Sequence, residues 1–287
     1  RFRPHDGTLD DFMASRREAH PDRELMRYED RSWTWQQAED ACARLAGRWR
    51  GQGVRAGDRI IVMGRNSAWH VLALLAAARL GAVFVPVNPQ FKLEEARYVI
   101  GHSEPAVVLA DEEAEPVARQ AMADLASRAV FQTMQSVDAP DAEPVPAGAG
   151  DPEATCIIIY TSGTTGFPKG VMHSQRSLIA AGEGFVERLH LQPSDRLLLI
   201  LPMFHINAMF YSVAGTLAAG ATLLIEPRFS ASSFWQRVQA LGATQVNIIE
   251  AVAAILLNRP ADEYISGHTL RKIYGVRQAM MARFRER

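Results

Sequence analysis

The feature that most constrains the fold of this chain is a repeated order of helix signal, glycine and short apolar run. Residues 34–37 form a capping box that predicts the start of a helix, and Gly51 lies where that helix should end. A β-branched run follows at 59–63, which predicts a strand. The same order recurs with a helix over 67–81 and a strand at 83–87. This alternation predicts an α/β fold.

The second half of the chain repeats this pattern after a connecting segment. Residues 138–152 are rich in Ala, Pro, Gly and acidic side chains, which predicts a surface linker between two α/β halves, 1–137 and 153–287. Further strands are predicted at 156–160, 196–201, 221–225 and 244–248. Crossover helices of this length favour mostly parallel sheets flanked by helices. The linker need not be a spatial boundary, because strands from both halves can enter one sheet.

Composition excludes several classes of protein. The chain has 287 residues, 48% of them hydrophobic, which is typical of a globular protein with a large core. Its formal charge is −1 and it has no long basic run, so we expect no nucleic-acid partner. Residues 1–6 are polar, so no secretory signal peptide is expected. The uncharged run 206–225 is divided by polar residues and Gly220, which favours a buried helix and strand over a membrane span.

The two cysteines, Cys42 and Cys156, lie far apart in apolar surroundings and lack the spacing of a metal site. We expect reduced, buried thiols in a cytoplasmic protein.

The strongest local signal is the segment 160–170, Tyr-Thr-Ser-Gly-Thr-Thr-Gly-Phe-Pro-Lys-Gly, which directly follows the apolar run 156–159. Glycines let backbone N–H groups approach an anion, hydroxyls donate to phosphate oxygens, and Lys169 adds a compact positive charge. The segment therefore predicts a polyphosphate-binding loop. It differs from a Walker A motif, which needs Gly-Lys-Ser/Thr at the start of a helix. A flexible linker is the alternative, but linkers seldom follow a buried strand directly.

At this point the sequence resembles the adenylate-forming superfamily, whose signature is Thr-Ser-Gly-Thr-Thr-Gly-x-Pro-Lys-Gly. The resemblance extends over most of the chain and is carried by residues 33–35, 80–89, 161–170 and 201–207. Within that superfamily, Pro-Met-Phe-His at 202–205 resembles acyl-CoA and aryl-CoA ligases. Residues 230–245 are most similar to carnitine/crotonobetaine-CoA ligases and to medium- and long-chain fatty acyl-CoA synthetases.

The resemblance implies a reaction and its substrates. A carboxylic acid would attack the α-phosphate of ATP to give an acyl-adenylate, with Mg²⁺ required, and the thiol of coenzyme A would then displace AMP. The small-molecule acid, ATP and CoA are the expected partners, with a homodimer as the assembly to test. An adenylation enzyme that loads a carrier-protein thiol is one alternative. A non-catalytic nucleotide-binding homologue is another.

The resemblance also implies roles for individual residues. The β- and γ-phosphates would be held by Thr161, Ser162, Gly163, Thr164, Thr165, Gly166 and Lys169. Thr161 would also lie near magnesium, and Lys169 and His205 are the expected catalytic residues. His205, Asn207 and Met209 would contact the acyl substrate. The alternative for His205 is a structural histidine at the start of a helix, and a methionine at the position of Met209 is more often part of the core.

Two segments depart from the family pattern. Glu250 stands where relatives often have proline, which suggests either a partner for a cationic substrate tail or a glutamate that stabilises the first turn of a helix. Residues 272–278 stand where many relatives have a glycine-rich wall against adenine.

The resemblance finally implies an expectation about extent. Residues 1–287 correspond to an incomplete N-terminal AMP-binding domain, without the later magnesium glutamate, the ribose aspartate or the C-terminal lid domain with its lysine. Arg1 in place of an initiator methionine also suggests trimming. We therefore expect the isolated segment to be inactive.

Overall fold

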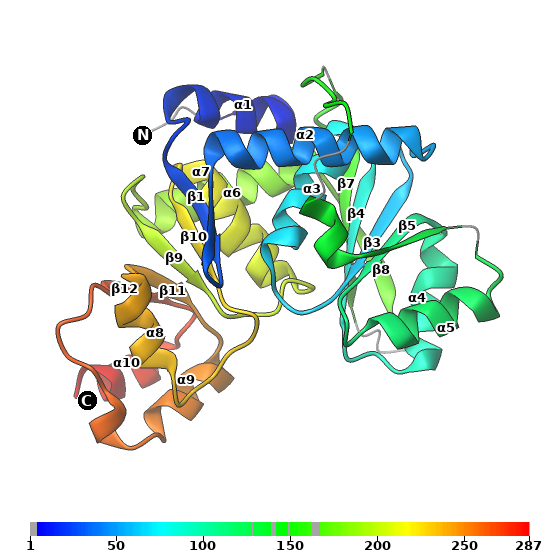
Figure 1. Ribbon diagram of the computed structural model, residues 1–287. Coiled ribbons are helices and arrows are strands. Elements are labelled where there is room, and N and C mark those ends of the chain that lie inside the picture. The colour runs from blue at the N-terminus through cyan, green and yellow to red at the C-terminus, as the bar shows by residue number, and fades with distance from the viewer. Residues whose placement is uncertain (1–4, 128, 139–141, 149, 162–166, 287) are drawn as a thin grey trace.

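The computed structural model describes residues 5–127, 129–138, 142–148, 150–161 and 167–286. Within these residues the chain forms two six-stranded sheets with helices packed against them (Figure 1). In each sheet four neighbouring pairs of strands are parallel, and the pair at one edge is antiparallel. This confirms the predicted α/β class with mostly parallel sheets.

Sheet A has the strand order β12-β11-β9-β10-β1-β2. Its strands are β1 (Glu24–Tyr28), β2 (Arg31–Thr34), β9 (Arg196–Leu199), β10 (Thr222–Ile225), β11 (Gln245–Asn247) and β12 (Lys272–Tyr274). The helical segments of this part of the chain are α6 (Gln175–Leu189), the π-helix η2 (Asn207–Val213), α7 (Ala214–Ala219), α8 (Phe234–Leu241), α9 (Glu250–Leu257), the 3₁₀ turn η3 (Ala261–Glu263) and α10 (Gln278–Arg285).

Sheet B has the strand order β6-β5-β3-β4-β7-β8. Its strands are β3 (Arg59–Met63), β4 (Val83–Val87), β5 (Pro105–Ala110), β6 (Val130–Thr133), β7 (Thr155–Thr161) and β8 (Lys169–Ser174). The remaining helices are α1 (Leu9–Ala19), α2 (Trp35–Gly51), α3 (Ala68–Arg79), α4 (Leu93–Ser103), α5 (Glu115–Asp124) and the 3₁₀ turn η1 (Met134–Asp138).

The central strands of sheet B, β3, β4 and β5, are apolar on both faces because they are nearly continuous apolar runs. Alternate residues of β3 point to opposite sides. Ile60 and Val62 enter the large core shared with sheet A, whereas Ile61 and Met63 enter a second cluster under α4 and α5. A parallel strand buried on both faces has this composition.

Helix α3 joins the two sheets. It contacts β1 of sheet A and β3, β4 and β7 of sheet B. Every residue of α3 except Trp69 is buried, as expected of a helix that is hydrophobic all round. The core therefore runs from one sheet to the other through α3.

Several local predictions are confirmed. Thr34 is the N-cap of α2, with the reciprocal capping-box hydrogen bonds to Gln37, and Gly51 is its last residue. The predicted strands 59–63 and 83–87 have the same bounds as β3 and β4. Ser67 lies at the N-cap of α3, but its hydroxyl bonds the Nδ1 atom of His70 (3.0 Å) instead of capping the helix.

Other boundaries differ from prediction. The runs 196–201, 221–225 and 244–248 form shorter strands than predicted, because strand pairing covers only residues 196–199, 222–225 and 245–247. The linker 138–152 does not separate the two sheets, as the sequence analysis allowed. Strands β1 and β2 from the first half enter sheet A, and β7 and β8 from the second half enter sheet B.

The expectation for the cysteines is confirmed for their burial and free state. Cys42 and Cys156 are both free and buried. Burial raises the pKa of both thiols, that of Cys156 to about 12. None of the helices in the described ranges is long and apolar enough to cross a membrane.

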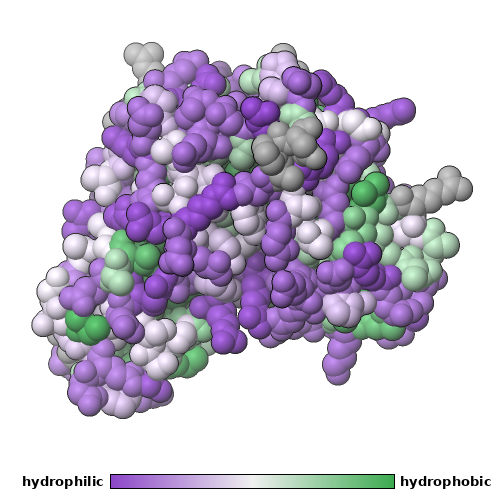
Figure 2. All heavy atoms as spheres, in the orientation of Figure 1, coloured by the Kyte–Doolittle hydropathy of each residue, from purple (hydrophilic) through white to green (hydrophobic). Residues whose placement is uncertain are grey.

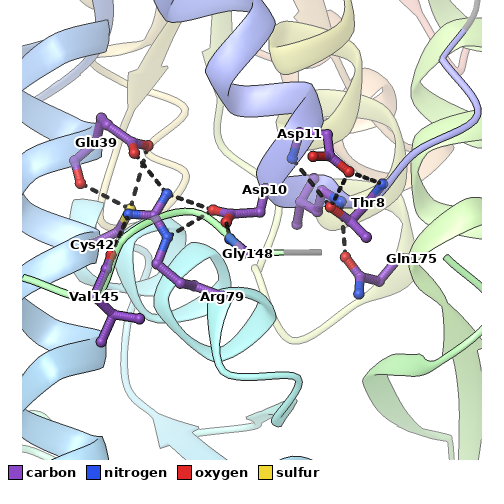
Figure 3. A network of polar contacts seen from close by, with 10 residues as sticks. Thr8, Asp10, Asp11, Glu39, Cys42, Arg79, Val145, Gly148 and Gln175 are labelled. Carbon is purple, nitrogen blue, oxygen red and sulfur yellow. Dashed lines mark hydrogen bonds and ion pairs between the residues drawn. The ribbon is translucent and has the colours of Figure 1, made fainter. Parts of the chain in front are cut away.

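A buried ionic network fastens the first three helices to the segment before β7 (Figure 3). The guanidinium of Arg79, at the end of α3, donates to Asp10 of α1 and to Glu39 of α2 (2.7 Å each). Arg79 also donates to the carbonyl of Val145 (3.3 Å), and Asp10 accepts from the backbone N–H of Gly148 (3.2 Å). We call these five residues the Arg79 network.

The outer surface is mostly polar on the face that Figure 2 shows. Hydrophobic residues on this face lie in small, separate patches between hydrophilic ones. Single exposed apolar side chains are normal on a protein surface. This view therefore gives no reason to place a binding surface there.

Candidate functional site

The candidate site lies where the carboxyl ends of strands from both sheets meet. The link between them is Asn66, which follows β3 of sheet B. Its Nδ2 atom donates to the carbonyl of Leu201 (3.0 Å) after β9 and to that of Glu226 (3.2 Å) after β10. Its Oδ1 atom accepts from the backbone N–H of Met203 (2.8 Å). Ligands of open α/β sheets bind at this edge of the strands.

Asn66 is a site residue that the sequence analysis missed. It is buried and makes all three bonds to backbone groups, two of them in the segment that leads into His205. A signal was available, because a polar Asn in the short segment between a buried strand and a buried helix has to find partners. What the sequence cannot give is the partner, which is about 135 residues away.

A pocket of about 380 Å³ opens at this junction. Its walls come from the end of β4, from α4, from both ends of the predicted phosphate loop and from the segment after β9. The lining residues are Pro86, Val87, Asn88, Phe91, Glu94, Glu95, Tyr98, Tyr160, Thr161, Phe167, Pro168, Phe204 and His205. We call it the junction pocket. It brings together Thr161 and His205, two of the residues predicted for the site.

Thr161 and Lys169 face each other at the base of the predicted phosphate loop. Thr161 ends β7, Lys169 begins the antiparallel strand β8, and the two are paired in register. Directly paired antiparallel residues have Cβ atoms about 4.5–5.5 Å apart and point to the same side of the sheet. A hydroxyl and an ammonium group therefore flank the entrance of the loop. The predicted site residues Ser162, Gly163, Thr164, Thr165 and Gly166 lie outside the described residues.

An aromatic stack supports the other end of this loop. The rings of Tyr98 on α4 and Phe167 are stacked with centroids 4.7 Å apart, and His102 stacks on Tyr98 at 5.5 Å. The Nδ1 atom of His102 bonds the hydroxyl of Tyr160 (2.8 Å), and burial raises the pKa of Tyr160 to about 12. The hydroxyl stays protonated, so the stack ties α4 to both ends of the loop. Ring contacts between distant segments carry no local sequence signal.

His205 is held at the pocket wall. Its backbone N–H donates to Pro202 (3.0 Å) and its ring lies 4.3 Å from that of Phe204. Partial burial lowers the pKa of the His205 imidazole below its usual value. The ring is therefore neutral near pH 7, with one nitrogen that donates and one that accepts.

A π-helix begins two residues after His205. π-helices are rare and are often found at functional sites. Met209, predicted to contact substrate, is fully buried in it, and its N–H donates to the carbonyl of His205 (3.4 Å). Asn207 is its first residue, and its Oδ1 atom accepts a hydrogen bond from the Nδ2 atom of Asn247 at the end of β11.

Glu250 is the first residue of α9, in agreement with the helix-start interpretation of the sequence. Its carboxylate forms an ion pair with Arg277 (3.1 Å), and it does not line the junction pocket. A substrate contact of Glu250 stays a prediction.

The segment 272–278 has a local structural explanation. Residues 272–274 form β12, and Gly275 follows with φ +93°. A Cβ atom at Gly275 would lie 1.9 Å from the carbonyl oxygen of Ile248, so only glycine fits there.

The described residues contain no cluster of three or more His, Cys, Asp or Glu side chains that could hold a metal. Thr161 offers one neutral oxygen for the predicted magnesium. Mg²⁺ in nucleotide sites keeps several waters and binds substrate phosphates, so it needs few protein ligands. One hydroxyl is compatible with such a coordination shell but does not by itself make a magnesium site.

Comparison with known proteins agrees with this geometry. Residues 13–287 match the AMP-binding enzyme family. A medium/long-chain-fatty-acid–CoA ligase of Mycobacterium tuberculosis is 33% identical over 276 residues, which cover 94% of this chain and 46% of that protein. A sulfoacetate–CoA ligase of Cupriavidus necator is 32% identical over 226 residues, which cover 75% of this chain and 44% of that protein.

The solved structures agree on the fold. The N-terminal domain of FACL13 from Mycobacterium tuberculosis superposes with a TM-score of 0.85 at 25% identity, covering 98% of this chain and 73% of that one. The chain spans less than half the length of the two curated relatives above.

Proposed function

Because this chain belongs to the AMP-binding enzyme family, we propose that it acts in an AMP-forming acyl-CoA synthetase, with ATP, a carboxylic acid and CoA as substrates. One observation carries the proposal. Thr161, which faces Lys169 across a hairpin at the base of a Gly- and Thr-rich loop, lines the same pocket as His205. The named relatives are CoA ligases for fatty acids and for sulfoacetate.

The proposed chemistry has two steps. A carboxylate oxygen attacks the α-phosphorus of ATP, the bond to the bridging oxygen breaks, and pyrophosphate leaves with its electron pair. The sulfur of CoA then attacks the acyl carbon, its proton is lost, and AMP leaves. Adenylyl transfer of this kind depends on positioning and on neutralising charge rather than on a protein nucleophile.

Lys169 and Thr161 are proposed to act on the phosphates. The ammonium group of Lys169 would offset negative charge on the β- and γ-phosphates, and the hydroxyl of Thr161 would donate to a phosphate oxygen or share the magnesium shell. Residues 162–166 are proposed to add backbone N–H donors.

His205 is proposed to act on the acyl group. A neutral imidazole at the pocket wall can donate one hydrogen bond to the substrate carboxylate and, in the second step, accept the thiol proton. Asn66 supports this role, because two of its three backbone bonds hold the segment that leads into His205.

Cytoplasmic location and assembly are proposals as well. Two free, buried thiols are expected of a protein in a reducing compartment. Light scattering would test the homodimer.

The test is carboxylate-dependent exchange between ATP and radiolabelled pyrophosphate, measured in the longest natural polypeptide that contains this sequence. Among aliphatic, aryl and carnitine-like acids, one class should be preferred. When CoA and a holo carrier protein are supplied in separate reactions, CoA should be the acceptor that consumes the adenylate. Nucleotide binding without exchange for any acid would reject the proposal in favour of a non-catalytic homologue.

A further inference from the structure

Two buried amide side chains and a third that is partly buried, beside the His205 segment, point to the class of acid that the proposed enzyme takes. Gln245 and Asn247 are 1% and 3% exposed, and both belong to β11. Successive residues of a strand alternate between its faces, so these two side chains lie on one face, about 7 Å apart along the strand. Asn207 completes the set through its hydrogen bond with Asn247. We call these three residues the amide cluster.

The amide cluster is not satisfied by the protein. Both polar atoms of the Gln245 amide and the Oδ1 atom of Asn247 are buried and have no hydrogen-bond partner in the structure. Leaving a buried polar group unpaired costs about 1–3 kcal/mol, so native structures rarely do it without a reason.

The place of the cluster connects it to the acyl site. Asn207 begins the π-helix two residues after His205, and Asn247 ends β11 at the carboxyl edge of sheet A. Tyr274, paired in register with Asn247, contacts the rings of Phe185 (5.3 Å) and Tyr211 (6.0 Å). Unpaired amides and an aromatic wall therefore adjoin the segment that carries the proposed catalytic histidine.

The charges near the cluster are already engaged. Lys272, in register with Gln245, donates to the carbonyl of His190 (2.9 Å), and the carboxylate of Asp195 accepts from Arg271 (2.6 Å). Glu250 is paired with Arg277. The polar groups left without a partner in this part of the described structure are therefore neutral amides, which favour a neutral hydrogen-bonding group over a cationic tail.

From these observations we infer that the amide cluster selects carboxylic acids with an uncharged hydrogen-bonding substituent, such as a hydroxyl or carbonyl, on the acyl chain. The inference rests on the proposed acyl-CoA synthetase function. A site built to hydrogen-bond a substrate hydroxyl rejects the analogue that lacks it, because its own polar groups are then left unpaired. A plain hydrocarbon chain would leave the polar atoms of the amide cluster without hydrogen-bond partners.

The experiment compares matched acids in ATP–pyrophosphate exchange, with the longest natural polypeptide that contains this sequence. The pairs are butyrate with γ-hydroxybutyrate, hexanoate with ω-hydroxyhexanoate, and benzoate with para-hydroxybenzoate. We expect at least about tenfold higher kcat/KM for the polar member of one pair, and about a tenfold loss of that preference in Asn247→Leu. The near-isosteric Leu removes the amide and keeps the volume.

The matched control is Gln132→Leu, which removes another buried amide, in β6 of sheet B. It should leave the preference unchanged. If Asn247→Leu does not fold, Asn207→Leu tests the same hydrogen bond from the partly exposed partner.

The outcomes separate the two proposals. Exchange that is equal for both members of every pair, or a preference that Asn247→Leu and Asn207→Leu leave unchanged, would overturn this inference and leave the synthetase function standing. In that case buried water satisfies the cluster. No exchange with any acid would reject the synthetase function, and the inference with it.

Discussion

The Arg79 network and the amide cluster are both polar and both buried, but they differ in how well the protein satisfies them. In the Arg79 network each charged group has a partner of opposite charge, and two backbone groups complete the set (Figure 3). In the amide cluster three polar atoms have none within the described structure.

The difference distinguishes two uses of buried polarity. A complete network costs desolvation but fixes one arrangement of the elements it joins, here α1, α2, α3 and the segment before β7. An incomplete cluster contributes nothing comparable to the fold, so its polar atoms are explained by something that binds to them. The first belongs to the scaffold and the second to the site.

The largest expected effect comes from breaking the complete network. Arg79→Met would leave Asp10 and Glu39 buried without a counter-charge, and removing one partner of a buried ion pair typically costs about 3–5 kcal/mol. Denaturant unfolding of residues 1–287 measures the loss. Arg176→Met, which breaks an exposed pair with Glu153, should change stability by no more than about 0.5 kcal/mol. Equal losses in the two variants would contradict the scaffold role.

Lys169→Ala should have the opposite pattern to Arg79→Met, with a large effect on activity and a small effect on stability. Loss of one charge that stabilises the transition state should lower the exchange rate about a hundredfold, equivalent to about 2.7 kcal/mol, whereas an exposed lysine adds little to stability. Lys92→Ala is the control, because Lys92 is also exposed but lies outside the hairpin of β7 and β8. Unchanged kinetics in Lys169→Ala would remove this residue from the site.

The scaffold was more predictable from sequence than the site. Strands β3 and β4 and helix α2 have their predicted bounds because caps and apolar runs are local signals. The parallel pairing of β1 with β10, in which Met26 lies opposite Leu223, was not predicted, because pairing between strands so far apart in the sequence has no local signal. Strand β8 was missed because Val171 and Met172 are the only apolar pair in it, which is too short a run to predict a strand. Both side chains are exposed, so burial did not require a longer run.

For the site, the resemblance predicted Thr161, Lys169 and His205, and the structure places Thr161 opposite Lys169 and in the same pocket as His205. Asn66 and Asn247 were not predicted, because a single Asn near the end of a strand is common and its importance depends on partners far along the chain. Their roles follow from unpaired or fully paired amide atoms, which only coordinates reveal.

A pH experiment extends the comparison to a neutral group of the scaffold. Burial lowers the pKa of His70, in α3, to about 3, and the ring bonds Ser67. Below the unfolded pKa of about 6.5 the unfolded chain binds a proton that the native state excludes, so stability falls as the pH falls. From pH 7.5 to 5 the loss should be about 2 kcal/mol. Denaturant unfolding should show a smaller loss of stability between pH 7.5 and 5 in His70→Gln. The control His190→Asn, which replaces an exposed histidine, should show the full loss. The same slope in both variants would show that other groups cause it.

The smallest effect is the most direct test of the comparison, because it removes the same side chain from a satisfied and an unsatisfied position. Gln132 accepts from the indole N–H of Trp49 (3.2 Å) and donates to Gln52 (2.8 Å). Gln132→Leu should therefore lower the free energy of unfolding by about 1–2 kcal/mol, since the indole loses its acceptor.

Gln245 has no partner to lose among the described residues. Gln245→Leu, nearly equal in volume, exchanges an unpaired buried amide for an apolar group and should leave the free energy of unfolding unchanged or raise it by up to about 1 kcal/mol. Paired denaturant titrations of the two variants at one pH give the difference. A loss in Gln245→Leu as large as that in Gln132→Leu would mean that ordered water already satisfies the amide, and the cluster would then belong to the scaffold.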